Sequence, residues 1–576
     1  MRGHVRGVVI EGVALMLVIA ACTTTSSPSS TTTPVTTIDS GSDSTVTTTT
    51  SPTTTTTSLA IPETQDRWIA ISGDQFIDTR TGNVFVPRGV NLLMKLGGGG
   101  GDRMFERYDP DWVESQLDAI SGLGFNTVRF FLDMCMSCTS TSSGIRDDYL
   151  DNLTDLLIRL EQHGLVAMPT SNDVPDPGYS ERLPCCTPFG GYRNSLYLSP
   201  EGHAIAVEYW TDLLEGIEQR GAPTHHLLGW ELANEQFVLR DVPPIPLKEG
   251  SVTTADGVTY DLADDDAIAE MVVNNLRAYV TTVGDAIRAI DDGALITMGF
   301  FSPEDPDAGR VSGDNRWVVP DEILQKSSLD FVDLHAYNGL GGTWSSIGAA
   351  YRLTGDPLGY PLLLGEFGSF EQAFPDPEEA AANVARWQAN SCDLGFGGWL
   401  VWFWGADKDD EVVTADSHGA VLARALSPEV RPDPCDPGPY ASANLALDQP
   451  VTASAEENEE YSAARAVDGS DATWWSAAEE PPQWIEVDLG QNTTVGRVEI
   501  LIGHVSPPGP QTHRVYLRAD GETGKGELAG EVSADASQGD WLTIAFEPVA
   551  GVRYVRVETT RMDGWVILHE VQVFAE

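Results

Sequence analysis

A strand-like apolar run recurs eight times between residues 84 and 404, and stretches with helical periodicity separate the runs. Strands that alternate with helices indicate a parallel sheet covered by helices, and eight such units fit a closed α/β barrel, the (β/α)8 TIM barrel. An open doubly wound sheet is the alternative, but the glycines at 97–101 lack the helix-opening context of its phosphate turn. We predict the barrel domain over residues 63–435. Its predicted strands span residues 84–92, 126–132, 165–170, 227–232, 294–299, 331–335, 361–366 and 398–404, and its helices include residues 147–163, 202–220, 267–290 and 378–389.

A second domain is predicted over residues 440–576, after the proline-rich segment 432–439. Helical periodicity disappears there, and short alternating strands are separated by turn residues. This pattern is typical of an all-β jelly-roll or β-sandwich. The predicted strands span residues 484–488, 497–501, 512–519, 541–546, 554–559 and 570–574.

The first 62 residues have the composition of a targeting segment followed by a spacer. A basic start and a short apolar stretch at 13–21 lead to small residues and Cys22, which resembles a bacterial lipoprotein signal lipidated at Cys22. An ordinary cleaved signal with an incidental cysteine is the alternative. Residues 23–62 are dominated by Thr, Ser and Pro and are expected to form a solvated linker. We therefore expect an extracellular protein, anchored at the cell surface through Cys22 or secreted.

The chain is strongly acidic, with 34 basic and 86 acidic residues and a formal net charge of −52. This balance argues against nucleic acid as a partner and against electrostatic docking on anionic lipid, so any membrane contact is expected through the lipid anchor alone. Strong acidity also suits a salt-adapted protein, and ordinary secreted acidity is the equal alternative.

Six cysteines remain besides Cys22, at positions 135, 138, 185, 186, 392 and 435. An even count in an exported protein suggests disulfides. We expect the first pair to bridge to the adjacent pair at 185–186, and Cys392 to bridge to Cys435, although the sequence leaves the connectivity open. The Cys-x-x-Cys spacing at 135–138 also allows a zinc site, but no histidine cluster accompanies it.

Two of the apolar runs end in a glutamate, at Glu235 within segment 229–235 and at Glu366 within segment 361–368. The C-terminal ends of barrel strands meet at one face, so the two carboxylates are expected to face each other. Two facing carboxylates are what glycoside hydrolysis requires: one protonates the leaving oxygen, and the other attacks the sugar or activates water. The alternative is a pair of unrelated surface glutamates.

Further motifs between residues 66 and 430 occur in the order and spacing of a known family. They are Val86-Pro87-Arg88-Gly89-Val90-Asn91, Asn126-Thr127-Val128-Arg129, the segment 329–337 that contains His335 and Tyr337, and Trp402-Phe403-Trp404. With the two glutamate segments, they resemble glycoside hydrolases of clan A, most closely family 5, which contains cellulases and β-mannanases.

The resemblance implies a retaining double displacement in which Glu366 is the nucleophile and Glu235 is the acid and base. It also implies substrate-binding roles for Arg129, Asn172, Asn234, His335, Tyr337 and Trp404. Trp404 is expected to stack under the sugar, with Trp402 on the opposite face as packing. Asn172 stands where many family members have histidine, which is similar to the mannanase branch. Arg129 and His335 have structural alternatives, as partner of a buried carboxylate and as a core histidine.

The C-terminal segment resembles the discoidin or coagulation-factor type C domain, shared with carbohydrate-binding module family 32. The matching residues are 444–447, 466–469, 473–476, 482–490 and 569–571. The resemblance implies a structural Ca²⁺ held near Asp468, Asp471, Thr473 and Glu570, since hard oxygen ligands suit calcium. Asp468-Gly469 alone could be a plain turn. Sugar contacts are expected from loop side chains such as Trp565 and His504.

These observations predict an exported O-glycosyl hydrolase, an endo-β-1,4-glycanase on mannan or glucan, that needs no cofactor for catalysis and carries an appended glycan-binding domain. It is expected to act as a monomer. The alternatives are an exo-acting β-glycosidase on oligosaccharides or glycoconjugates, and a non-catalytic surface glycan-binding protein. The loss of either glutamate would mark the non-catalytic protein, and both are present.

Overall fold

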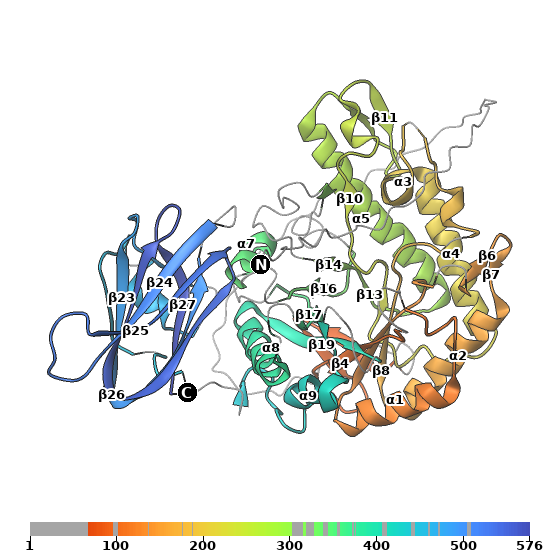
Figure 1. The fold of residues 1–576 in the computed structure, drawn as a ribbon. Coiled ribbons are helices and arrows are strands. Elements are labelled where there is room, and N and C mark those ends of the chain that lie inside the picture. The colour runs from red at the N-terminus through yellow and green to blue at the C-terminus, as the bar shows by residue number, and fades with distance from the viewer. Residues whose placement is uncertain are drawn as a thin grey trace, which may run out of the picture. The chain divides into compact units, whose positions relative to one another are not determined.

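The computed structural model describes residues 67–575, with breaks at 96–101, 136–137, 176, 187, 302–314, 318–327, 338–343, 354–357, 371–373, 375, 406–411, 439–443, 448, 459–460, 470–472 and 504–508 (Figure 1). The predicted signal peptide with Cys22, the linker, Asp471 and His504 therefore lie outside the described residues. No helix within the described ranges is both long and apolar enough to cross a membrane.

The predicted barrel is confirmed. Its strands pair in parallel in the order β13-β9-β8-β5-β4-β19-β17-β16-β14. The predicted fifth strand is interrupted at Met298, so that its first part pairs with β9 and its second part with β16. The eight barrel strands are therefore described as nine segments. They are β4 (Arg88–Leu92), β5 (Thr127–Phe131), β8 (Val166–Thr170), β9 (Trp230–Glu231), β13 (Ile296–Thr297), β14 (Gly299–Phe301), β16 (Val332–His335), β17 (Leu362–Phe367) and β19 (Phe396–Trp404).

Helices surround this sheet (Figure 1), and the four predicted ones form within two residues of their expected bounds. Several begin at a side-chain cap that satisfies free backbone N–H groups, as Asp376 does for Glu378 and Glu379. The buried leucines of residues 147–162 recur with the helical period. The helices are α1 (Pro110–Gly122), α2 (Asp147–Gln162), α3 (Tyr192–Leu198), α4 (Pro200–Glu218), α5 (Asp265–Ile290), α7 (Trp344–Tyr351), α8 (Pro377–Ser391) and α9 (Ser417–Leu426), with 3₁₀ turns at η2 (Ser180–Arg182), η3 (Ile245–Leu247) and η4 (Cys392–Leu394).

A small antiparallel sheet closes one end of the barrel. It consists of β1 (Ile69–Ser72), β2 (Gln75–Asp78) and β3 (Asn83–Phe85). Ile69 and Phe76 pack with inward side chains of the barrel strands, among them Met168, Leu363 and Leu400. This apolar plug leaves the C-terminal strand ends as the open face.

Short strand pairs lie in the loops between the barrel elements. The pair β11–β12 is an antiparallel hairpin in the loop after Glu235. The pairs are β6 (Ser140–Thr141) with β7 (Gly144–Ile145), β10 (Val238–Leu239) with β15 (Arg316–Trp317), β11 (Ser251–Thr253) with β12 (Thr259–Asp261), and β18 (Ser369–Phe370) with β20 (Val412–Val413).

The C-terminal domain is the predicted antiparallel β-sandwich, with its own apolar core. Two strand predictions need correction: residues 484–488 and 497–501 belong to one long strand, as do 541–546 and 554–559, because register shifts bend these strands instead of breaking them. Residues 527–536 form a strand that was not predicted, because few of its side chains are buried. The elements are β21 (Val451–Ala453), η6 (Ala463–Ala466), β22 (Trp475–Ser476), β23 (Gln483–Ile502), β24 (Gly509–Arg518), β25 (Glu527–Ala536), β26 (Trp541–Arg561) and β27 (Ile567–Phe574).

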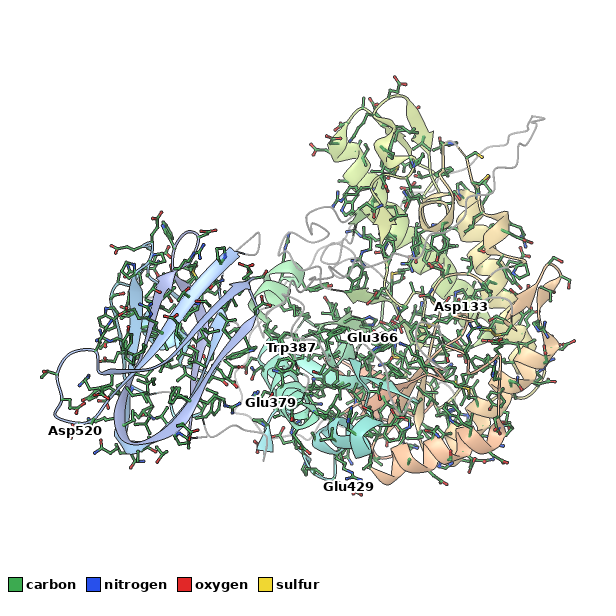
Figure 2. All side chains as sticks on the ribbon, in the orientation of Figure 1. Asp133, Glu366, Glu379, Trp387, Glu429 and Asp520 are labelled. Carbon is green, nitrogen blue, oxygen red and sulfur yellow. A yellow bond between two sulfur atoms is a disulfide. The ribbon has the colours of Figure 1, made fainter. Side chains whose placement is uncertain are left out.

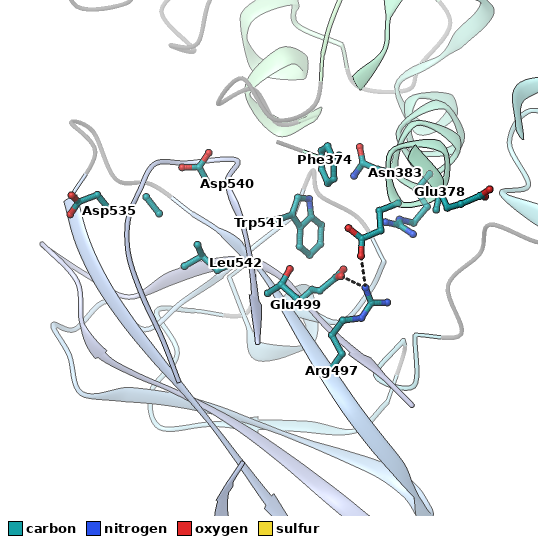
Figure 3. A pocket seen from close by; sticks show the side chains of 14 residues that line it. Phe374, Glu378, Asn383, Arg497, Glu499, Asp535, Asp540, Trp541 and Leu542 are labelled. Carbon is teal, nitrogen blue, oxygen red and sulfur yellow. Dashed lines mark ion pairs between the residues drawn. The ribbon is translucent and has the colours of Figure 1, made fainter. Parts of the chain in front are cut away.

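Side chains two residues apart on β23 share a face of the sandwich. Arg497 and Glu499 form an ion pair there at 2.9 Å (Figure 3). This spacing is what the two-residue period of a strand requires.

The disulfides only partly follow the expectation. Cys392 and Cys435 are bonded as predicted. Cys135 bonds to Cys138 and not to the 185–186 pair, so that expectation is wrong. Their Cα atoms lie 5.6 Å apart, within the range that a disulfide spans, so the local turn brings them together without a distant partner. A bonded pair also has no thiolates for the alternative zinc site.

Candidate active site

The two glutamates that the sequence singled out lie together at the open face of the barrel. Glu235 follows β9 by four residues, and Glu366 lies within β17 among the barrel strands (Figure 2). One carboxylate oxygen of each, together with a ring nitrogen of His335, lie within 4.8 Å of one another. The side chain of Glu366 is 5% exposed and that of Glu235 is 31% exposed. Glu235 is therefore the more accessible of two facing carboxyl groups.

Arg129 on β5 is fully buried beneath the site and forms hydrogen bonds to several of its residues. Its Nη1 donates to Glu366 Oε1 at 2.7 Å and to Asn91 Oδ1 at 2.7 Å. Its Nη2 donates to Asn234 Oδ1 at 2.5 Å, and its Nε donates to Glu231 Oε2 at 2.8 Å. The guanidinium thus orients Glu366 and Asn234 at the same time. Sequence reasoning missed the roles of Asn91 and Glu231, although both stand inside the quoted motifs.

His335 on β16 and Tyr337, two residues beyond it, complete the contacts of the two carboxylates. His335 Nδ1 lies 3.1 Å from Glu235 Oε1 and 3.5 Å from Glu366 Oε2. The Tyr337 hydroxyl donates to Glu366 Oε2 at 2.8 Å. Glu366 therefore has a donor on each oxygen, from Arg129 and from Tyr337, which suits an oriented carboxylate.

The charges of the site are set by His335. Burial would lower its pKa, but the negative charges of Glu366 and Asp333 raise it to about 10. Burial raises the pKa of Glu366 above its ordinary value, against the charges of His335 and Arg129. Burial acts in the same direction on Glu235, yet the hydrogen bond and charge of His335 outweigh it and hold the pKa of Glu235 below its ordinary value. In the free molecule an imidazolium therefore faces both carboxyl groups.

Arg193 at the start of α3 supports Glu235 from the other side. It donates through Nη1 to the backbone carbonyl of Glu235 and forms an ion pair with Asp173 at 3.0 Å. Its guanidinium also lies over the ring of Phe237 at 4.0 Å. The arginine lies 42 residues before Glu235 and no motif marks it, so sequence reasoning missed it.

Asn172, a predicted substrate-binding residue, is half-buried just after β8. Its backbone N–H donates to Asp133 Oδ1 at 2.6 Å. No described contact joins its side chain to Glu235 or Glu366. Asp133, labelled in Figure 2, was not predicted as a site residue. Burial raises its pKa to about 7, although Ser171 donates a hydrogen bond to it.

The two tryptophans of β19 lie in surroundings that differ from those expected. The ring of Trp404 is buried in the main core, and its Nε1 donates to Gln116 of α1 at 2.9 Å, on the helix side of the strand. Trp402 is half-buried and packs edge-on against Phe131, whose ring lies under Arg129. A register shift between Val401 and Trp404 turns the strand end, so simple alternation did not predict which ring lies near the site.

The predicted calcium residues of the sandwich are partly described. The Thr473 hydroxyl donates to both oxygens of Asp468, at 2.8 and 2.9 Å. Glu570 on β27 is buried, and the neighbouring His569 Nδ1 lies 3.0 Å from the Thr473 carbonyl. Carboxylate, hydroxyl and carbonyl oxygens are ligands that suit calcium. Within the described residues, however, the two carboxylates are not part of a compact three-ligand cluster.

Comparison with known proteins agrees with this division of the chain. Residues 450–571 match the F5/8 type C domain family, which confirms the predicted discoidin-type domain. A solved chitosan-binding module 1 from the chitosanase/glucanase of Paenibacillus sp. IK-5 is 32% identical and covers 23% of this chain and 98% of its own, with a TM-score of 0.20.

Part of the chain is also similar to a mannanase. Mannan endo-1,4-beta-mannosidase A of Podospora anserina is 28% identical over 245 residues, which is 40% of this chain and 52% of the relative. The alignment thus spans about half the length of that relative. The solved endo-1,4-beta-mannanase of Rhizomucor miehei is 18% identical and covers 63% of this chain and 99% of its own, with a TM-score of 0.43. The sequence relationship to the mannosidase confirms the predicted resemblance to the β-mannanases.

Proposed function

We propose that the barrel hydrolyses a β-1,4-linked polysaccharide, mannan first among the candidates, with retention of the anomeric configuration. The observation that carries this proposal is the distance of at most 4.8 Å between carboxylate oxygens of Glu235 and Glu366. Retaining enzymes hold their two carboxyl groups about 5–5.5 Å apart, whereas inverting enzymes leave about 6.5–9.5 Å for a water molecule. The mannosidase relative supports the choice of mannan over glucan.

In this mechanism Glu366 attacks the anomeric carbon while Glu235 protonates the leaving oxygen. Arg129 and Tyr337 each donate to one oxygen of Glu366, which keeps it ionised and aimed. Glu235 then removes a proton from the water that releases the sugar from Glu366. Asn234, oriented by Arg129, is close enough to the site to bind the sugar 2-hydroxyl.

Glu235 must carry a proton in the first step, although His335 favours its ionised form in the free molecule. Its side chain is 31% exposed, so a bound sugar would displace the water that solvates it. Loss of solvation disfavours a carboxylate and raises its pKa. Substrate binding therefore prepares the acid.

We assign the stacking platform for the sugar to Trp402 instead of Trp404. The half-buried ring of Trp402 lies beside Phe131, and a Cβ atom at Gly368 would contact both Trp402 and the ring of Tyr337. Aromatic faces stack on the apolar face of sugars, and Trp404 is occupied by its hydrogen bond to Gln116.

The sandwich is proposed to bind glycan and to hold a structural Ca²⁺ at Asp468, Asp471, Thr473 and Glu570. Its exposed Trp565, 51% accessible, is the candidate sugar contact. We also propose export and lipidation at Cys22, which the basic start, the short apolar stretch at 13–21 and the small residues before Cys22 support. Incorporation of a radiolabelled fatty acid that is lost in Cys22→Ala would test the anchor.

The test of the function is product release from β-mannan, glucomannan, cellulose derivatives and short manno-oligosaccharides, with folded Glu366→Ala as the matched control. Polymer cleavage that is lost in the variant supports the endo-glycanase. Proton NMR of the first product distinguishes retention from inversion, and an inverted anomer would contradict the double displacement. Activity on oligosaccharides alone favours the exo-glycosidase, and inactivity with retained glycan binding favours the non-catalytic protein.

A further inference from the structure

A second pair of carboxylates lies directly beneath the active site. Glu231 on β9 and Asp333 on β16 both have side chains that are 0% exposed. Oxygens of the two groups and a ring nitrogen of His335 lie within 4.8 Å of one another. Neither carboxylate reaches the substrate side, so the proposed mechanism leaves both without a role.

The hydrogen bonding of this pair is incomplete. Glu231 Oε2 accepts from Arg129 Nε at 2.8 Å and from the Thr170 hydroxyl at 2.5 Å. Glu231 Oε1 and both oxygens of Asp333 accept no hydrogen bond from any described residue. Asp333 Oδ2 lies 3.5 Å from His335 Nε2 and 3.7 Å from Arg129 Nε. A buried carboxylate with no donor is costly when it is ionised.

Two glycines make room for these oxygens. A Cβ atom at Gly299 would lie 2.4 Å from Glu231 Oε1, and one at Gly365 would lie about 2 Å from both Asp333 oxygens (2.0 and 2.1 Å). The strands β14 and β17 thus present bare backbone to the pair. Any side chain at either position would expel a carboxylate from its place.

The charges that surround the pair do not balance if every acid is ionised. The groups facing it are Arg129 from β5, His335 from β16, Glu366 from β17 and Glu235 from the loop after β9. Two cations therefore meet four carboxyl groups. Neighbouring carboxylates in a buried site retain a proton, because two like charges at short range cannot both ionise freely.

We propose that Glu231 and Asp333 share one proton and act as a positioning pair that holds Arg129 and His335 in place beneath the two glutamates. The catalytic consequence rests on the proposed glycosidase function, but the shared proton does not. Burial, with the nearby charge of Asp333, raises the pKa of Glu231 to about 8 in spite of Arg129, which is consistent with a neutral Glu231 at pH 7.

The arrangement has a clear effect on the site. A neutral Glu231 still accepts from Arg129 but does not neutralise it, so the guanidinium charge remains directed at Glu366. The nearby charge of Asp333, together with that of Glu366, raises the pKa of His335. Both effects place positive charge under the carboxylates that carry out the reaction.

Infrared difference spectroscopy of the full chain tests the proton without any activity measurement. Wild type minus Glu231→Gln at pH 7 is expected to show the carbonyl stretch of a protonated carboxyl group, and this band should disappear as the pH rises through about 8. Asp133→Asn is the matched control, because Asp133 is another buried acid, whose pKa burial raises to about 7, and lies outside the pair. This control variant should retain the carboxyl band that titrates near pH 8.

Asp333→Asn provides the second variant. It should lower the pH at which the band titrates, because the negative charge that raises the pKa of Glu231 is gone. If Glu231→Gln fails to fold, the pH titration of the wild-type band and its shift in Asp333→Asn still test the shared proton. A wild type without a carboxyl band near pH 7, or a band that neither variant changes, would overturn the shared proton.

Kinetics test the positioning role. Glu231→Gln mimics the neutral acid and is expected to keep kcat/KM within about threefold at pH 6, whereas Glu231→Ala should lower kcat by about tenfold or more with little change in KM. Equal losses in both variants would contradict the role. A wild type that cleaves no glycan but shows the band would refute the proposed function and leave the shared proton standing.

Discussion

The Nδ1 atom of His335 lies 3.1 Å from Oε1 of Glu235 and 3.5 Å from Oε2 of Glu366, so one ring controls the ionisation of both carboxyl groups. A single cation between an acid and a nucleophile lowers the pKa of both. The pH dependence of the reaction should therefore respond to this ring more than to any other group.

Replacing His335 with asparagine should move both limbs of the pH profile to higher pH. In the substrate complex, the acid limb of kcat reports ionisation of Glu366 and the alkaline limb reports loss of the proton from Glu235, and removal of the cation raises the pKa of both groups. Tyr337→Phe is the matched contrast, since it removes a donor from Glu366 alone and should move only the acid limb. Identical profiles for wild type and His335→Asn would contradict this electrostatic role.

Glu235→Gln should discriminate between leaving groups. Substrates with poor leaving groups need protonation and should lose about 10²–10⁴ in kcat/KM, while aryl glycosides with activated leaving groups should lose far less. The measurement is kcat/KM on mannan and on a nitrophenyl glycoside. Equal losses on both would remove Glu235 from the acid role.

The two tryptophans of β19 should behave differently when each is replaced by alanine. Trp402→Ala should lower kcat/KM by about tenfold or more with a modest loss of stability, because a half-buried platform is lost. Trp404→Ala should lower stability by about 3–5 kcal/mol, since a buried ring leaves a cavity. Thermal unfolding and kinetics on the two variants separate these effects, and the reverse pattern would restore Trp404 as the platform.

His226 should make the barrel sensitive to acid. Its ring is fully buried beside Trp68, and burial, with the charge of His225, lowers its pKa to about 3. A histidine with a folded pKa below its unfolded value binds fewer protons when folded. Its contribution is complete above about pH 6.5 and is lost as the pH falls toward 3, at about 1.4 kcal/mol per pH unit.

His226→Phe should therefore flatten the dependence of Tm on pH between 6.5 and 3. A slope that His226→Phe does not change would exclude His226 as the acid-sensitive group.

Removal of calcium should destabilise the sandwich and leave the barrel transition unchanged. Binding to the folded state alone stabilises by about 2.7 kcal/mol when free calcium is 100 times Kd, so a chelator should lower the Tm of that domain. Calorimetry with and without chelator measures this, and Asp468→Ala should abolish the difference. A sandwich transition indifferent to both would remove the metal from the proposal.

The sequence by itself determined the barrel, the sandwich and the meeting of the two glutamates. Apolar runs that end in Glu235 and Glu366 are sufficient for this, because the C-terminal ends of parallel strands share one face whatever the loops do. The resemblance to family 5 pointed to Arg129 and Tyr337, and both contact Glu366 in the structure.

Only the tertiary structure decided the orientation of the tryptophans, the disulfide at Cys135 and the contacts of Arg193 and Asp333. Each depends on a register shift, a local turn or a contact between residues far apart in the chain, which periodicity does not encode. The proton balance beneath Arg129 is the clearest case. Hydrophobic pattern specifies which strands are buried, but the charge state of Glu231 and Asp333 depends on how many donors the folded barrel brings to their oxygens.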